Sequence, residues 1–270
     1  TFGAVDGYLA PAATSVVVTA GATNVFTSVY ASASGSLTVT LTPSTAVTDG
    51  RWSLDGGAVW AGSANELASK SDIVFFMVPD IPQVRAVLAG ENGLLAGVDK
   101  EILLVVCSTV SPDAVRQLDV DVSEITNGLA RVIDAPVSGG QVGAEAGTLS
   151  IMVGGPDDLV AKALPYLKLA GNPAHLGPTG AGEVAKACNQ LIGAANIIAN
   201  AEAAVVAERA GLDVAKLFEL MLGGYSSSTI MADKAPRYIN KDYTVSGAAS
   251  FWIKDLKAYL DRLEEAKKRD

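Results

Sequence analysis

The chain has 270 residues, of which 49% are hydrophobic and 18% charged, and its formal net charge at pH 7 is −9. This apolar fraction is sufficient for one large core or two ordinary ones, so the composition excludes a wholly disordered chain. The negative charge argues against a protein that binds nucleic acid or an anionic membrane. Cys107 and Cys188 lie far apart and outside any Cys/His cluster. The cysteine pattern therefore argues against a disulfide framework or a zinc site, and it is typical of a reducing cytoplasm.

The segment at residues 7–48 has an unusual composition. It contains no charged residue, and Ala, Ser, Thr and Val supply 30 of its 42 positions. Residue propensity favours strands around 16–18 and 37–41. Taken alone, the segment is typical of a Ser/Thr-rich β module or a low-complexity stretch.

Strands and helices alternate from residue 57 onwards. The expected strands lie at 72–78, 101–106, 130–133 and 149–153, and the expected helices at 63–69, 82–88, 112 onwards and 157–169. Ser111 and Pro112 have the residue types of an N-cap and a first helical position. Residues 172–178 are interpreted as a loop. The alternation predicts an α/β fold with a parallel sheet covered by helices on both faces.

After residue 180 the pattern is helical. A long Ala/Ile-rich helix is expected at 183–210, ended by Gly211, with further helices at 213–222, 227–238 and 248–267. The most apolar stretch, 187–201, is shorter than the roughly 20 residues of a membrane span, so we interpret it as a buried helix of a soluble protein. The sequence thus divides into an α/β domain at 1–177 and an all-α domain at 178–270.

The first candidate for chemistry is DAPVSGG at residues 134–140. Ser138, Gly139 and Gly140 form a turn in which backbone N–H groups are not shielded by Cβ atoms. Such a turn can hold an anion, for example a carboxylate. The alternative interpretation is a sharp turn between two strands.

The second candidate is Lys186, which shares a helix face with Asn189. A partly desolvated lysine on a face of small residues can act as a general acid or base. The alternative is a lysine that reaches solvent from an amphipathic helix. Lys254 and Asp255 form a third group, for which the alternative is the charged surface of the last helix.

Residues 77–80 and 107–112 follow two predicted strands, and ligands bind at such carboxyl ends in open parallel sheets. His175 has no acidic or cysteine partner nearby in the sequence, so we interpret it as structural. Cys188 is expected to be a small packing residue rather than a nucleophile.

Together, these segments resemble the β-hydroxyacid dehydrogenase family, which includes 3-hydroxyisobutyrate dehydrogenase and tartronate semialdehyde reductase. The resemblance is carried by DAPVSGG at 134–140, GTLSIMVGG at 147–155, GAGEVAKACNQ at 180–190 and WIKDLK at 252–257. SDIVFFMVPD at 71–80 and CSTVSP at 107–112 extend it to about three quarters of the chain. It implies a Rossmann-type dinucleotide-binding domain and an all-α domain, joined by a long interdomain helix.

The resemblance also implies a role for individual residues. Lys186 would be the catalytic acid/base of hydride transfer between NAD or NADP and a small β-hydroxy acid or semialdehyde acid. The substrate's carboxylate and hydroxyl would be held by Ser138, Gly139, Gly140 and Asn189. The cofactor would be contacted by Met77, Val78, Pro79, Thr109 and Lys254. A cytoplasmic homodimer or homotetramer is expected, with no nucleic-acid, membrane or metal partner.

The chain departs from the family at its beginning. The family has GxGxxG after its first strand, whereas residues 2–10 contain glycine only at positions 3 and 7. One explanation is that residues 1–56 are a different module, which would leave the dinucleotide-binding domain incomplete. The other is that these residues have the backbone of the family's strand–helix–strand unit although the sequence as given does not display the motif. The choice between NAD and NADP depends on this segment. The all-α domain is also shorter than the family's by a few tens of residues.

Two alternative functions remain open. One is a non-catalytic binding or scaffold protein that keeps the fold but has lost the dinucleotide site. The other is a relative of the imine reductases, although APVSGG together with a helical lysine favours hydroxy acids.

Overall fold

The computed structural model describes residues 61–244 and 250–268, so the segment at 1–56 lies outside the described residues. The chain divides into two compact units, with the boundary between Lys186 and Ala187. This boundary falls inside α6 (Ala181–Arg209), a helix of 29 residues. Lys186 and the residues that precede it therefore belong to the first unit.

The first unit is built on a six-stranded sheet. Its strands are β1 (Ile73–Phe76), β2 (Ile102–Val106), β3 (Ala130–Asp134), β4 (Val137–Ser138), β5 (Leu149–Gly154) and β6 (Gly171–Gly177). The order is β1-β2-β3-β5-β4, and β6 pairs with β5. β1, β2 and β3 are parallel, β5 is antiparallel to β3 and β4, and β6 is parallel to β5. The α/β fold is confirmed, but the sheet is mixed rather than wholly parallel.

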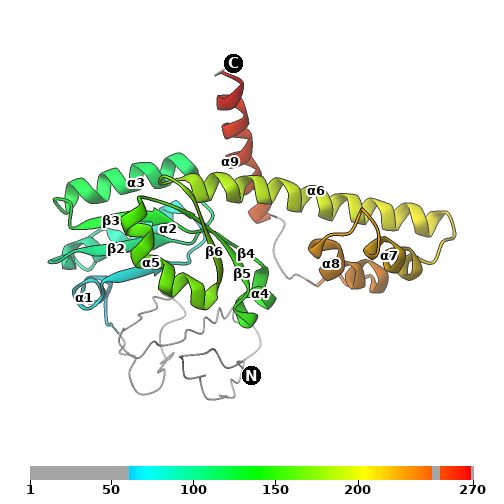
Figure 1. The fold of residues 1–270 in the computed structure, drawn as a ribbon, viewed down its shortest axis with the longest axis horizontal. Coiled ribbons are helices and arrows are strands. Elements are labelled where there is room, and N and C mark those ends of the chain that lie inside the picture. Colours follow the sequence, from blue (N-terminus) through cyan, green and yellow to red (C-terminus); the bar gives the residue numbers. More distant parts are fainter. Residues whose placement is uncertain (1–60, 245–249, 269–270) are drawn as a thin grey trace, which may run out of the picture. The chain divides into compact units, whose positions relative to one another are not determined.

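Helices cover both faces of this sheet (Figure 1). In β2, Leu104 and Val106 pack with α1 (Ala64–Lys70), α2 (Ile81–Leu88) and α3 (Pro112–Ile125). Leu103 and Val105 point to the opposite face and pack with α5 (Asp157–Ala170). Because successive side chains of a strand alternate between faces, burial on both sides requires the continuous apolar run seen at 102–106.

Local sequence signals set the remaining boundaries of the first unit. The Ser63 hydroxyl accepts from the Glu66 N–H and caps α1, and Asp80 caps α2 from the end of the β1 loop. A 3₁₀ helix, η2 (Leu94–Gly97), precedes β2, and a short helix, α4 (Gly140–Ala146), connects β4 to β5. With only this short connection available, β4 and β5 pair antiparallel, because a parallel pair needs a longer crossover.

The predicted loop at 172–178 is wrong, because residues Gly171–Gly177 form β6 beside β5. Glycine, proline and asparagine disfavour strands in general, so composition alone indicates a loop here. Pro173 lacks an N–H donor, which a strand tolerates best at the edge of a sheet. The backbone partners that β5 supplies outweigh the low local propensity.

The described secondary-structure elements of the second unit are all helices, as predicted. It comprises the rest of α6 with α7 (Val214–Leu222), α8 (Thr229–Asn240) and α9 (Ser250–Lys267). Its buried core consists of Ala204, Phe218, Met231 and Ala235. The rings of Phe218 and Tyr238 stack with centroids 5.8 Å apart. Aromatic pairs at this distance stabilise a small core beyond the area that they bury.

The interpretation of 187–201 as a buried helix is wrong. Within α6, an 18-residue apolar window is only 22% buried, and by length and composition the helix is sufficient to cross a membrane. Its exposed apolar side chains in the second unit are Leu191, Ile192, Ile198, Val205 and Val206. An apolar surface of this extent on one helix is typical of a face that another protein surface covers.

Candidate active site

Lys186 lies near the beginning of α6 and is only 7% exposed. A lysine that reached bulk water along the helix surface would keep its ammonium exposed. The structure therefore excludes the interpretation of Lys186 as a solvent-reaching surface lysine. Burial of a titratable amine is the condition under which lysines act in general acid/base chemistry.

The position of Lys186 is set by Asp134, the last residue of β3. The Asp134 carboxylate is fully buried and accepts hydrogen bonds from the N–H groups of Gly180, at 2.6 Å, and Glu183, at 2.9 Å. The first N–H groups of a helix have no partner within the helix, so Asp134 acts as a cap supplied by a distant strand. It fixes the end of α6 that carries Lys186.

Burial raises the pKa of Asp134 to about 6, although hydrogen bonds from the Gly180 and Glu183 N–H groups act in the opposite direction. Two glycines make room for this carboxylate. A Cβ on Gly154 would lie 2.6 Å from Asp134 Oδ1, and a Cβ on Gly182 would lie 2.8 Å from Oδ2. The glycines of the two family-like segments therefore allow the close approach of β5 and α6 to Asp134.

The buried carboxylate predicts a pH-dependent stability. Because its pKa rises from 3.8 to about 6 on folding, protonation favours the folded state. The contribution is complete below about pH 4 and is lost as pH rises through about 6. We expect the free energy of unfolding of the wild type to fall by up to about 3 kcal/mol relative to that of Asp134→Asn over this range. A pKa difference of one pH unit corresponds to about 1.4 kcal/mol. Urea unfolding at several pH values measures the difference, with the exposed Asp99→Asn as control. A difference independent of pH would contradict the prediction.

Glu183 connects α6 to the loop that follows β2. Its side chain is 1% exposed, and its Oε2 accepts a hydrogen bond of 3.1 Å from the Val110 N–H. Burial and, to a smaller extent, the Glu183 charge raise the pKa of the Cys107 thiol to about 12. Cys107 therefore remains a thiol and is not a nucleophile at neutral pH.

Ser108 connects the loops after β1 and β2. Its hydroxyl accepts from the Val78 N–H at 3.0 Å and donates to the Phe76 carbonyl at 3.4 Å. Met77 is 55% exposed beside this link, Pro79 is exposed, and Thr109 is half-buried. Hydrogen bonds thus join residues 77–79 to the loop at 107–110, and this loop to the first turns of α6, at the carboxyl ends of two parallel strands.

Ser138, Gly139 and Gly140 lie at the end of β4, four to six residues after Asp134. Ser138 is half-buried and pairs with Ser150 of β5, whereas both glycines are exposed. The φ angles of Gly139 and Gly140 are +138° and +60°, a backbone that residues with a Cβ rarely adopt. The segment is thus a sharp turn at a strand end, and its exposed backbone is compatible with anion binding.

In the second unit, a chain of hydrogen bonds links Asn189 to Lys254. The Asn189 amide donates to Gln190 at 3.0 Å, and Gln190 donates to Asp255 at 2.7 Å. Asp255 also accepts from Lys254 at 2.8 Å. Because Asp255 is only 6% exposed, the interpretation of this group as ordinary charged surface is wrong.

The remaining two side chains considered from the sequence are Cys188 and His175. Cys188 is exposed, so the expectation that it is a small packing residue is wrong. It lies on a different face of α6 from the buried Lys186 and Gln190. The His175 Nε2 lies 2.9 Å from the carbonyl oxygens of both Gly155 and Gly177. It holds two turns together, in agreement with a structural role.

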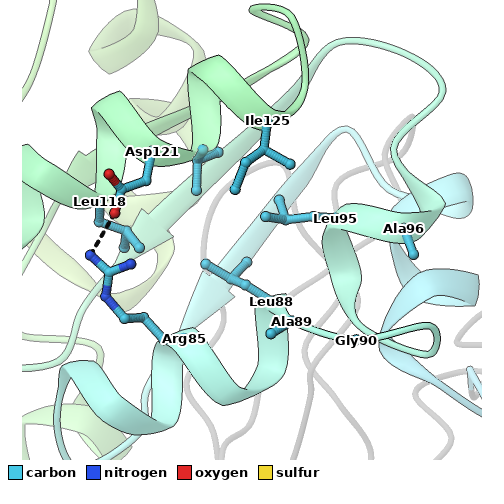
Figure 2. Close-up of a pocket in the computed structure, with 10 residues that line it drawn as sticks. Arg85, Leu88, Ala89, Gly90, Leu95, Ala96, Leu118, Asp121 and Ile125 are labelled. Atoms are coloured by element: carbon cyan, nitrogen blue, oxygen red, sulfur yellow. Dashed lines mark ion pairs between the residues drawn. The ribbon is translucent and has the colours of Figure 1, made fainter.

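A hollow of about 400 Å³ lies away from all these residues, between α2, η2 and α3 (Figure 2). Arg85 and Asp121 form an ion pair of 2.7 Å at one side, and the remaining lining is mainly apolar. The lining comes from the carboxyl-terminal parts of α2 and α3, whereas the loops at 77–80 and 107–111 precede the amino ends of these helices. The hollow therefore does not belong to the candidate site.

Sequence reasoning missed four residues that organise the site. Asp134 and Glu183 are within the family-like segments, but their buried hydrogen bonds span 46 and 73 residues. Ser108 and Gln190 were not distinguished from their neighbours. The available signal was a polar residue at the carboxyl end of a buried strand or on the apolar face of a helix, where burial requires a partner.

Two family models match the chain. The NAD binding domain of 6-phosphogluconate dehydrogenase matches residues 14–193, and the NAD-binding domain of NADP-dependent 3-hydroxyisobutyrate dehydrogenase matches residues 180–269. The first match begins within the segment of unusual composition. The two matches overlap at residues 180–193, in the first part of α6, where the boundary between the compact units also lies.

Individual relatives agree with these models. The chain is 38% identical to 2-hydroxy-3-oxopropionate reductase from Escherichia coli, over 76% of this chain and 69% of that protein. It is 37% identical to NAD-dependent L-serine dehydrogenase from Pseudomonas aeruginosa, over 74% and 69%. Among solved structures, Mycobacterium tuberculosis 3-hydroxyisobutyrate dehydrogenase with L-serine has a TM-score of 0.66 at 30% identity, over 78% and 74%.

Proposed function

Because this chain belongs to the β-hydroxyacid dehydrogenase family of NAD(P)-dependent oxidoreductases, we propose that it reduces a small semialdehyde acid, or oxidises the matching β-hydroxy acid, with Lys186 as general acid/base. The observation that carries this assignment is the burial of Lys186 on the first turns of α6. A hydrogen bond ties these turns to the loop after β2, and a second bond ties that loop to the loop after β1. Substrates of the tartronate semialdehyde or 3-hydroxyisobutyrate type fit the proposal.

The chemistry follows from the two protonation states of Lys186. When bound, the nicotinamide supplies or accepts the hydride. In the reductive direction, the Lys186 ammonium donates its proton to the carbonyl oxygen of the substrate. In the oxidative direction, the neutral Lys186 amine removes the hydroxyl proton. A buried position favours this role, because water does not compete for the proton.

The remaining predicted site residues take part in the same proposal. Ser138, Gly139 and Gly140 hold the substrate carboxylate, supported by their exposed, glycine-rich turn. The nicotinamide contacts Met77, Val78, Pro79 and Thr109; an exposed methionine beside a proline at a strand end is suited to a planar ring. In the second unit, Asn189 binds the substrate and Lys254 the cofactor.

The proposal extends to assembly and location. The exposed apolar residues of α6 in the second unit are covered by another copy of the chain, in a homodimer or homotetramer. Because the amino end of α6 is capped by buried Asp134 in the sheet, we interpret its apolar surface as an assembly face of a soluble, cytoplasmic protein. We also propose the division expected from the sequence, a domain at 1–177 and a domain at 178–270, with its boundary just before α6.

The proposed reaction is tested by following NADH and NADPH oxidation with tartronate semialdehyde and, as a matched control, glycolaldehyde, which lacks the carboxylate. We expect a preference of at least about 100-fold in kcat/KM for the acid, since a site built for a charged group rejects an analogue without it. Oxidation of glycerate, 3-hydroxyisobutyrate and L-serine tests the reverse direction.

A fluorescence titration with NADH separates this proposal from its alternative. Binding without turnover of any of these acids would contradict the assignment of the substrate class. Failure to bind NADH or NADPH would support a non-catalytic protein that keeps the fold.

A further inference from the structure

Glu183 is a buried carboxylate within one helical turn of Lys186. It is 1% exposed, and Lys186 is 7% exposed. Transfer of a carboxylate from water into a protein interior costs several kcal/mol unless hydrogen bonds and opposite charge compensate. A glutamate at this position therefore calls for an explanation beyond helix formation, which an uncharged residue would serve as well.

Two hydrogen bonds, one from its backbone and one to its side chain, hold Glu183 in place. Its backbone N–H donates to Asp134 Oδ2 at 2.9 Å, and its side-chain Oε2 accepts from the Val110 N–H at 3.1 Å. The first bond joins Glu183 to the end of β3. The second joins it to the loop after β2, next to Thr109. The carboxylate therefore connects the helix of Lys186 with the loop proposed to contact the nicotinamide.

The spacing also places Glu183 beside Lys186. Residues three apart on a helix lie on the same face, with Cβ atoms about 5–6 Å from each other. An opposite charge at such a distance, in surroundings shielded from water, favours the charged form of each partner. Glu183 thus provides negative charge where an ammonium must hold its proton.

We propose that Glu183 is a positioning residue with two functions: its carboxylate fixes the 107–110 loop against α6, and its charge keeps Lys186 in the ammonium form required for reduction. The inference rests on the proposed acid/base role of Lys186 and adds a residue that acts through it. The predicted consequence is that the loop contact and the protonation of Lys186 can be altered separately.

Among the described residues, other titratable groups pack around the same turn. Burial keeps Cys107 of the β2 loop as a neutral thiol. The Asp134 carboxylate faces the backbone N–H groups of α6. Arg116 of α3 donates to the Thr179 carbonyl and pairs with Asp113. Among these described groups, Glu183 is the carboxylate that shares a helix face with Lys186.

Two substitutions separate the two functions. Glu183→Gln keeps an oxygen that can accept from Val110 but removes the charge. We expect the pKa of Lys186, and the oxidative pH limb of kcat/KM with glycerate, to fall by about one pH unit, with the NADH Kd changed by less than about threefold. Glu183→Asp keeps the charge but shortens the side chain. We expect the NADH Kd to rise about tenfold, as for loss of one hydrogen bond to a charged group, with the pH limb in place.

The protonation of Lys186 is followed directly by nitrogen NMR on protein with labelled lysine, assigned with Lys186→Arg, and Kd by NADH fluorescence. Glu202→Gln, an exposed position on α6, is the matched control and should change neither value. An unchanged Lys186 titration in Glu183→Gln overturns the charge role, and an unchanged NADH Kd in Glu183→Asp overturns the loop role. If one of the two variants does not fold, the other still tests its own part of the proposal, the charge role for Glu183→Gln or the loop role for Glu183→Asp. A Lys186→Ala variant that remains active would instead refute the proposed function, whatever the Glu183 variants do.

Discussion

Substitution of Lys186 by alanine should lower kcat/KM for tartronate semialdehyde by about 10³-fold, within the 10²–10⁴ range that a positioned general acid contributes. The loss should appear mainly in kcat, because the proton is transferred only in the transition state. NADH affinity should change little, since the residues proposed to contact the cofactor are on other segments. Steady-state kinetics with NADH at saturation and a fluorescence titration of NADH measure the two effects.

Two controls make this expectation specific. Lys216→Ala removes an exposed lysine of α7 and should leave the kinetics unchanged. Addition of ethylamine to Lys186→Ala should restore part of the activity, because a small amine can enter the space left by the side chain and supply the missing proton. A Lys186→Ala variant that retains more than about a tenth of wild-type kcat would refute the acid/base role.

The sequence left two interpretations of Lys186 open, a partly desolvated lysine and a solvent-reaching one, and it did not identify the residues that position its helix. GAGEVAK places a lysine at a fixed distance from the beginning of a helix, and small residues around it indicate a buried face. The partner of that helix end is Asp134, 46 residues earlier in the chain. A helix cap is normally sought in the residues just before the helix, where 178–180 offers no carboxylate. Only the arrangement of β3 beside α6 identifies it.

The alternation of strands and helices predicted the α/β fold correctly, because burial on both faces leaves a continuous apolar run in the sequence. The direction of β5 and the presence of β6 could not be predicted from the sequence pattern. β5 runs antiparallel to β3 because a short glycine-rich segment connects it to β4. β6 has the composition of a turn, and its pairing with β5 depends on tertiary contacts that no local pattern records.

Helical periodicity predicted the second unit but not its surface. The apolar side chains of α6 indicated a buried helix, whereas many of them are exposed in a single chain. Apolar residues on a helix show that a surface is covered in the functional state, but they do not say which molecule covers it. Conversely, Asp255 had the charge of a surface residue and is buried by its bonds to Gln190 and Lys254.

Gly182→Ala should lower the free energy of unfolding by about 2–4 kcal/mol, the range expected when an added atom meets a rigid, well-packed interior. A Cβ at this position would lie 2.1 Å from the Met152 carbonyl oxygen and 2.8 Å from Asp134 Oδ2. Because the first contact is with backbone, the beginning of α6 must move away from β5. Alanine's higher helix propensity, worth up to about 1 kcal/mol, opposes the effect but is too small to reverse it.

The same displacement should reduce turnover. Movement of α6 weakens the hydrogen bonds from Gly180 and Glu183 to Asp134, which leaves a buried carboxylate with fewer donors. It also displaces Lys186, which lies on the next turn of the same helix. A misplacement of about 1 Å can lower the rate about 100-fold. Gly223→Ala is the matched control: its Cβ would meet its nearest neighbour, the Leu220 carbonyl oxygen, at 3.6 Å. Urea unfolding and kcat are measured for both variants. If Gly182→Ala were as stable and active as Gly223→Ala, the capped beginning of α6 would not determine where Lys186 lies.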